Sequence, residues 1–155
     1  MTAAFADTFY FLALLDSREE QHAQAAELSR DPQLHLVTTE WVLAEFGDAY
    51  SDPQDRADFV ALYRSLLNHP RVNIIPADTR LFQRGVALFE QRPDKEWSLT
   101  DCLSFVVMHD EGITRALTAV RPTVLHFHQL GAVTSGFAGN LGAASSGGVW
   151  HQRHR

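Results

Sequence analysis

The chain has 155 residues, of which 45% are hydrophobic and 21% charged, with a formal net charge of -6. This composition is typical of one soluble globular domain and excludes a fully disordered or fibrous chain. No apolar run approaches the ~20 residues that a membrane span needs, and the single cysteine, Cys102, excludes an internal disulfide or a multi-cysteine metal site. The first ten residues include Asp7 and no basic residue, unlike a secretory signal, so we expect a cytoplasmic protein.

Charge is distributed unevenly along the chain. All 19 carboxylates lie at or before Glu111, whereas basic residues continue to the end of the chain. An acidic body argues against broad electrostatic capture of nucleic acid. It does not exclude a nuclease whose carboxylates hold cations, because a bound metal reverses the local field.

The elements predicted for the first third of the chain are a strand, two helices, a second strand and a third helix. Ala3–Ala6 is a short apolar strand that ends at Asp7, and the apolar spacing from Phe9 to Leu15 predicts a helix. Ser17 and Glu20 have the spacing of a capping box, which predicts that another helix begins there. The next predicted elements are a strand at Leu34–Thr38 and a helix at Glu40–Tyr50.

The same alternation continues through the middle of the chain. Asp52-Pro53 predicts the start of a helix that ends at Asn68, because proline is favoured at the first helical position. A third strand is predicted at Val72–Ile75, and Asp78 has the side-chain type that caps a helix. The remaining predicted elements are a helix capped by Ser98 or Thr100 that runs from Asp101 to about Asp110, a stop at Gly112 and a strand at Ile113–Ala119.

Alternating strands and helices predict an α/β protein, in which a mostly parallel sheet is covered by helices on both faces. The end of the chain departs from this pattern, because five of the nine glycines lie between Gly136 and Gly148 among alanine and serine. We therefore expect a domain over residues 1–134 and a flexible Gly/Ala/Ser-rich tail over residues 135–155.

Three carboxylates are candidates for one site. Asp7 follows the first strand, Glu45 lies on the helix after the second strand, and Asp101 lies in the first turn of the helix before the fourth. Ligands of an open parallel sheet bind at the carboxyl ends of its strands, and like charges gathered there need a cation. Carboxylate oxygens suit Mg²⁺ or Mn²⁺, which activate water and neutralise the charge that grows on a scissile phosphate. The plainer alternatives are a helix cap for Asp7, a surface residue for Glu45 and a first-turn acid for Asp101.

Three segments carry a family resemblance. Phe5-Ala6-Asp7-Thr8, the run from Thr38 to Glu45, and the run from Trp97 to Cys102 resemble the motifs of PIN-domain ribonucleases, and of toxins of the VapC type in particular. The resemblance extends over residues 3–119. It implies a three-layer α/β/α PIN-like fold and Mg²⁺- or Mn²⁺-dependent endoribonuclease activity on RNA. It also implies an antitoxin protein that blocks the site, and a homodimer.

The same resemblance assigns roles to individual side chains. Asp7, Glu45 and Asp101 are expected to be the catalytic, metal-binding acids. Their expected polar neighbours are Thr8, Ser98 and Thr100.

One acidic residue of the family pattern is missing. The position after the fourth strand holds Val120, or Val124 if the chain is aligned on the later His-Phe pair, and no carboxylate follows Glu111. His126 and His128 are alternative nitrogen ligands, which Mn²⁺ tolerates better than Mg²⁺. The missing acid predicts weakened metal-dependent activity.

Two other functions remain as alternatives to an active nuclease. One is a binding module that keeps the fold but lacks a working site. The other is a different sheet protein with clustered carboxylates, which the sequence disfavours. A phosphoacceptor domain needs a late lysine, whereas the only lysine is Lys95, and an aspartyl phosphatase needs an aspartate where this chain has Phe9.

Overall fold

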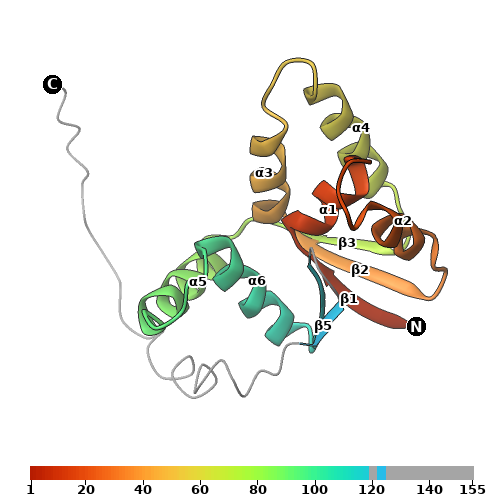
Figure 1. The fold of residues 1–155 in the computed structure, drawn as a ribbon. Coiled ribbons are helices and arrows are strands. Elements are labelled where there is room, and N and C mark those ends of the chain that lie inside the picture. Colours follow the sequence, from red (N-terminus) through yellow and green to blue (C-terminus); the bar gives the residue numbers. More distant parts are fainter. Residues whose placement is uncertain (119–121, 125–155) are drawn as a thin grey trace, which may run out of the picture.

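The structure is a computed structural model that describes residues 1–118 and 122–124 (Figure 1). Its elements are β1 (Thr2–Ala6), α1 (Thr8–Leu15), α2 (His22–Arg30), β2 (Leu34–Thr39), α3 (Glu40–Ala49), α4 (Arg56–Leu67), β3 (Val72–Ile75), α5 (Thr79–Gln91), α6 (Leu99–Asp110), β4 (Arg115–Leu117) and β5 (Pro122–Val124). The predictions for Val120, His126, His128, the boundary near residue 134 and the tail over residues 135–155 lie outside the described residues.

The strands form one sheet in the order β3-β2-β1-β4-β5. β1 pairs in parallel with both β2 and β4, β2 pairs in parallel with β3, and β5 is an antiparallel edge strand. Because crossovers between parallel strands are right-handed, reversing their direction along the sheet moves the connecting helices to its other face. α1–α4 therefore cover one face and α5–α6 the other, as Figure 1 shows. This arrangement confirms the predicted α/β/α class, including the contact between the first and fourth strands.

The sheet topology places a binding edge beside β1. The chain leaves β1 toward β2 and β3, then returns to form β4 on the other side of β1. Such a reversal leaves a crevice at the carboxyl ends of the strands, where open α/β sheets bind ligands. Asp7, Glu40 and Pro76 follow three of these strand ends directly.

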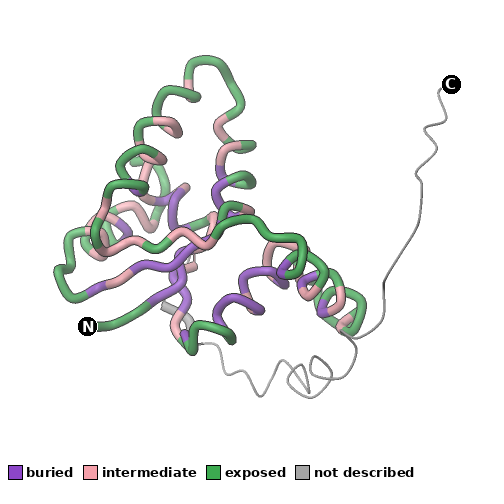
Figure 2. The backbone as a smooth tube through the Cα atoms, turned by 180° about the vertical axis from the view of Figure 1, so that it is seen from behind, coloured by how far each residue is buried: buried purple, intermediate pink, exposed green. Residues whose placement is uncertain are grey.

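The core is built from side chains of the strands and of the helix faces that cover them, which appear as buried stretches in Figure 2. Phe11 of α1 and Phe46 of α3 are both buried, and their ring centroids lie 5.7 Å apart. This contact fixes the spacing of the two helices that follow β1 and β2. Phe9, in contrast, is 57% exposed, and Trp41 is half-buried against Phe82.

The end of α6 explains why β4 begins later than predicted. Gly112 has a positive φ of 65°, which glycine adopts without a steric penalty. The backbone N–H groups of Gly112 and Ile113 donate to the carbonyls of His109 and Met108, at 3.2 and 2.8 Å. These bonds form a Schellman motif, so the N–H of Ile113 caps the helix and the strand begins at Arg115.

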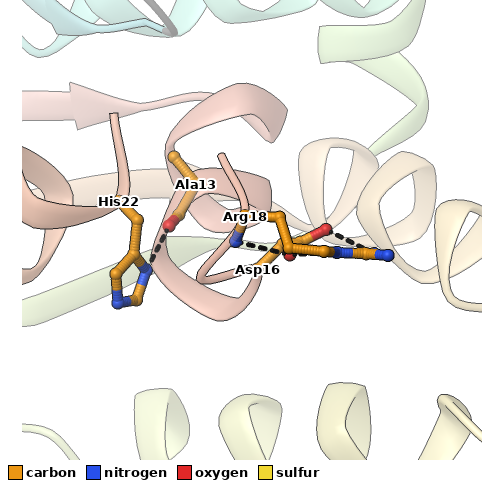
Figure 3. A network of polar contacts seen from close by, with 4 residues as sticks. All are labelled: Ala13, Asp16, Arg18 and His22. Atoms are coloured by element: carbon orange, nitrogen blue, oxygen red, sulfur yellow. Dashed lines mark hydrogen bonds and ion pairs between the residues drawn. The ribbon is translucent and has the colours of Figure 1, made fainter. Parts of the chain in front are cut away.

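The turn between α1 and α2 differs from its prediction. Asp16, rather than Ser17, organises it, because its carboxylate accepts hydrogen bonds from the backbone N and the guanidinium of Arg18 at 2.8–2.9 Å (Figure 3). His22 Nδ1 lies 2.9 Å from the carbonyl oxygen of Ala13 and ties α2 back to α1. The predicted capping box at Ser17 is therefore wrong, and α2 begins at His22.

The start of α4 also lies later than predicted. The backbone N–H groups of Asp55 and Arg56 donate to the carbonyl of Asp52, at 2.9 and 3.2 Å, so this segment forms a turn before the helix.

In the described part of the chain, no helix is long and apolar enough to cross a membrane.

Candidate active site

Asp7 lies at the junction of β1 and α1. Its Oδ1 accepts a hydrogen bond of 3.0 Å from the backbone N of Tyr10, so the carboxylate caps α1. Its own backbone N donates to the carbonyl of Leu117 in β4, at 3.5 Å. The plainer reading of Asp7 as a helix cap is therefore correct, and it is compatible with a second role.

The Asp7 carboxylate lies in an unfavourable electrostatic position. Burial raises its pKa to about 6, and the nearby carboxylates of Asp101 and Glu45 add to that rise. Hydrogen bonds from the backbone N–H groups of Tyr10 and Phe9 oppose the rise without cancelling it. Asp7 is thus near enough to interact with each of the other two candidate acids, although they are far from it in the sequence.

Glu45 is held by a side chain of α1. Thr39 caps α3 by accepting a 3.1 Å hydrogen bond from the backbone N of Val42, and Glu45 follows on the same helix. The Glu45 carboxylate is exposed and accepts a hydrogen bond from the hydroxyl of Thr8. Thr8 therefore ties Glu45 to the start of α1, and its role as a polar neighbour of a catalytic site stays a prediction.

Asp101 is oriented by the start of α6. Its backbone N donates to Ser98 Oγ at 3.0 Å, and its Oδ2 accepts from the backbone N of Ser98 at 2.8 Å. This reciprocal pair is a capping box, which immobilises the Asp101 carboxylate. Thr100 lies in the same turn, and its carbonyl accepts a hydrogen bond from Ser104 Oγ at 2.8 Å.

The donor chemistry of this site fits a hard divalent cation. Asp7, Glu45 and Asp101 supply carboxylate oxygens, and within residues 1–118 and 122–124 no ion pair joins them to a basic side chain. The negative charge that Asp101 and Glu45 add to the effect of burial on the Asp7 pKa is therefore not neutralised by an ion pair in these ranges. No group of three His, Cys, Asp or Glu side chains in these ranges is drawn together into a ligand cage. The assignment of the three acids as metal ligands stays a prediction.

Other residues of the motifs have structural roles. Glu40 Oε2 accepts a 2.6 Å hydrogen bond from the backbone N of Ala77, which ties the start of α3 to the segment before α5. Cys102 is fully buried, and burial with the nearby Asp101 raises the pKa of its thiol to about 11, so it packs as an inert apolar side chain.

Sequence reasoning did not single out the buried Thr38. Its hydroxyl donates a 2.9 Å hydrogen bond to the carbonyl of Ala6, immediately before Asp7. In the sequence, Thr38 only begins the run to Glu45 that carries the family resemblance, and nothing there indicates a role of its own.

Comparison with known proteins places this geometry in a family. A search of curated proteins found no match. The crystal structure of VapC20 from Mycobacterium tuberculosis, described as a sarcin–ricin loop cleaving toxin, superposes with a TM-score of 0.67 and 23% sequence identity. The match covers 74% of this chain and 88% of that chain, and it supports the fold. The family model described as the PIN domain matches residues 4–119, which include all three candidate acids. The chain therefore belongs to the PIN-domain family.

Proposed function

We propose that this chain is a divalent-metal-dependent endoribonuclease and the toxin of a toxin–antitoxin pair. The observation that carries the proposal is the match of the PIN-domain family model to residues 4–119, which include Asp7, Glu45 and Asp101. Asp101 and Glu45 also add negative charge near Asp7, whose pKa burial raises to about 6. In a PIN-domain chain, this uncompensated charge suits a cation and, through the cation, the phosphate of an RNA. The fold-level likeness to VapC20 supports the same class of activity.

The three acids share one proposed role, which is to bind the metal. Asp7, Glu45 and Asp101 would hold Mg²⁺ or Mn²⁺ through carboxylate oxygens. When bound, such a metal lowers the pKa of water and neutralises charge on a scissile phosphate. Thr8 keeps Glu45 oriented and Ser98 keeps Asp101 oriented, so both carboxylates are arranged before substrate binds.

The missing fourth acid sets the expected strength of the activity. No carboxylate follows Glu111, so a second cation lacks a ligand at position 120. One metal covers fewer of the charges that develop on attacking and leaving oxygens than two metals do. We therefore propose weak RNA cleavage that is faster with Mn²⁺ than with Mg²⁺.

The test is cleavage of a mixed RNA pool, and of a sarcin–ricin loop hairpin, by purified protein with each metal and with EDTA. Asp101→Asn should abolish cleavage, because the amide retains an acceptor for the Ser98 cap but loses the charge. Asp48→Asn is the matched control on an exposed carboxylate of α3. Cleavage that persists in EDTA or in Asp101→Asn would show that RNA cleavage does not depend on a metal held by these carboxylates.

Val120→Asp separates the proposal from its alternative. If position 120 reaches the site, the added carboxylate should raise cleavage above that of the wild-type chain. Complete inactivity of both proteins would instead favour a PIN-fold binding module.

We also propose a cognate antitoxin protein as a partner that covers the site. A small reading frame beside the gene is the first candidate to test. Co-expression of its product should suppress cleavage and co-purify with the chain, and failure of every neighbouring product to do so would contradict the toxin assignment.

We propose a homodimer as a second assembly, and α5 supplies the surface to test. Phe82, Val86 and Phe89 lie at helical spacing and are each 40–50% exposed. Trp41 of α3 stacks on Phe82 with ring centroids 6.2 Å apart, which extends the apolar strip. Replacing Phe82 and Phe89 by serine should convert a dimer into a monomer in light scattering, whereas Leu67→Ser, at an exposed leucine of α4, should not. A monomeric wild-type chain would contradict this proposal.

A further inference from the structure

Thr38 holds the peptide group that presents Asp7. The backbone register between β1 and β2 ends at the pair Phe5↔Val37. One residue further, the Thr38 hydroxyl takes over and donates to the carbonyl of Ala6 at 2.9 Å. The carbonyl of Ala6 and the N–H of Asp7 belong to the same peptide plane.

That peptide plane is held from both sides. The N–H of Asp7 reaches the carbonyl of Leu117 in β4 at 3.5 Å, which is a long bond. The Thr38 bond on the β2 side is the shorter of the two. The orientation of the peptide, and with it the direction in which Asp7 leaves the sheet, therefore depends mainly on Thr38.

Thr39, the residue after Thr38, connects β2 to the helix that carries Glu45. Thr39 caps α3 through the backbone N of Val42, and Glu45 lies on that helix. The Glu45 carboxylate in turn accepts from the hydroxyl of Thr8, the residue after Asp7. Three threonine side chains thus make hydrogen bonds that, with the backbone between them, connect Asp7 to Glu45 by two routes. One route runs through Thr8, and the other runs through Thr38, Thr39 and α3.

We propose that Thr38 is a positioning residue of the metal site, which sets the direction of Asp7 relative to Glu45 by holding the Ala6 carbonyl. The inference rests on the proposed function, because it concerns how the metal-binding acids are aligned. Thr38 is fully buried, so its hydroxyl would be unfavourable there without a partner, and valine would suit the strand better on packing grounds alone.

The test compares Thr38→Val, which keeps the shape and removes the hydroxyl, with Thr38→Ser, which keeps the hydroxyl. Mn²⁺ binding is measured by calorimetry on the full chain without RNA, and cleavage is measured separately. Loss of an outer partner of a metal ligand typically weakens metal binding by about tenfold or more, so we expect that loss for valine and wild-type binding for serine. In cleavage, valine should lower kcat and leave the KM for RNA unchanged.

Ser29→Ala is the matched control, because it removes a side-chain hydrogen bond to the Ala26 carbonyl in α2, away from the site. It should leave Mn²⁺ binding and cleavage unchanged. If the valine variant does not fold, Thr38→Cys replaces it in the comparison with serine, because a thiol has a similar size and is a weak donor.

The outcomes separate this inference from the proposed function. A wild-type chain that binds Mn²⁺ and cleaves RNA, together with a valine variant (or the cysteine variant, where valine does not fold) that binds Mn²⁺ as tightly, would overturn the role of Thr38 alone. A wild-type chain that neither binds Mn²⁺ nor cleaves RNA would overturn the proposed function and this inference with it.

Discussion

The hydroxyl of Thr8 donates a hydrogen bond to the carboxylate of Glu45, which joins the first turn of α1 to the middle of α3. The two residues are 37 positions apart, so the contact exists only in the folded chain. Because Glu45 is exposed, water competes with this bond, and its value lies in orientation more than in stability.

Thr8→Val should therefore change activity more than stability. We expect the free energy of unfolding to fall by less than about 1 kcal/mol, because the bond is exposed, and RNA cleavage to fall about tenfold. Thr8→Ser should restore cleavage. Urea unfolding and the cleavage assay provide the two measurements, and equal cleavage by all three proteins would contradict an orienting role.

Asp7→Asn should stabilise the metal-free protein above about pH 6. The folded state raises the pKa of Asp7 from 3.8 to about 6, so wild-type stability falls as the pH rises between these values. Asparagine keeps an acceptor for the Tyr10 N–H and carries no charge. We expect a gain of about 1–2 kcal/mol after allowing for solvent screening of a half-buried group. Urea midpoints in EDTA should differ at neutral pH and converge below pH 4, and no difference at neutral pH would contradict the electrostatic account.

Metal binding should depend on pH through the same carboxylate. A cation must displace the proton of Asp7, so the apparent Mn²⁺ affinity should fall by about tenfold per pH unit below about pH 6 and level off above it. Calorimetric titration at several pH values measures this dependence. An affinity that stays constant from about pH 5 to about pH 7 would show that Asp7 is not a ligand.

Gly85 and Gly47 should respond differently to alanine. A Cβ atom at Gly85 would lie 2.5 Å from Leu103 Cδ2 and 2.7 Å from its Cγ, whereas at Gly47 the nearest atom is Phe59 Cζ at 3.1 Å. Alanine gains about 1 kcal/mol of helix propensity at either position. Overpacking of the fully buried Leu103 costs about 1–3 kcal/mol, so Gly85→Ala should destabilise the protein, while Gly47→Ala should be nearly neutral. Thermal unfolding of both variants tests the contrast, and equal melting temperatures would contradict it.

The sequence predicted best where a local pattern has a local cause. The strand Val72–Ile75 has the predicted bounds, and Asp78 caps α5 by accepting from the backbone N of Leu81. The predicted helix cap at Ser98 is also present, in a capping box with Asp101.

Prediction failed where a neighbouring side chain takes the hydrogen bonds that a local pattern assigns elsewhere, or where a distant segment supplies the contact. The Ser17 pattern has capping-box spacing, yet the carboxylate of Asp16 takes the hydrogen bonds of that turn. The antiparallel strand Pro122–Val124 was not predicted, because its pairing with β4 depends on a neighbour rather than on its own pattern. The hydrogen bond of Thr38 also depends on a distant neighbour. Threonine is an ordinary strand residue, and only the fold brings the carbonyl of Ala6 beside its hydroxyl.

The Asp7 carboxylate caps α1 and the Asp101 carboxylate completes the capping box of α6, and both are also proposed to carry charge for the reaction. Asparagine can accept the same backbone hydrogen bonds, so both helices would remain capped after the charge is lost. At these two positions, a substitution can therefore remove the activity and leave the fold intact. A lineage under pressure to silence the activity could do so by amide substitution and still present an intact surface to its partners. Alanine would instead remove the cap of α1 at Asp7, and at Asp101 it would remove the half of the capping box that the carboxylate supplies.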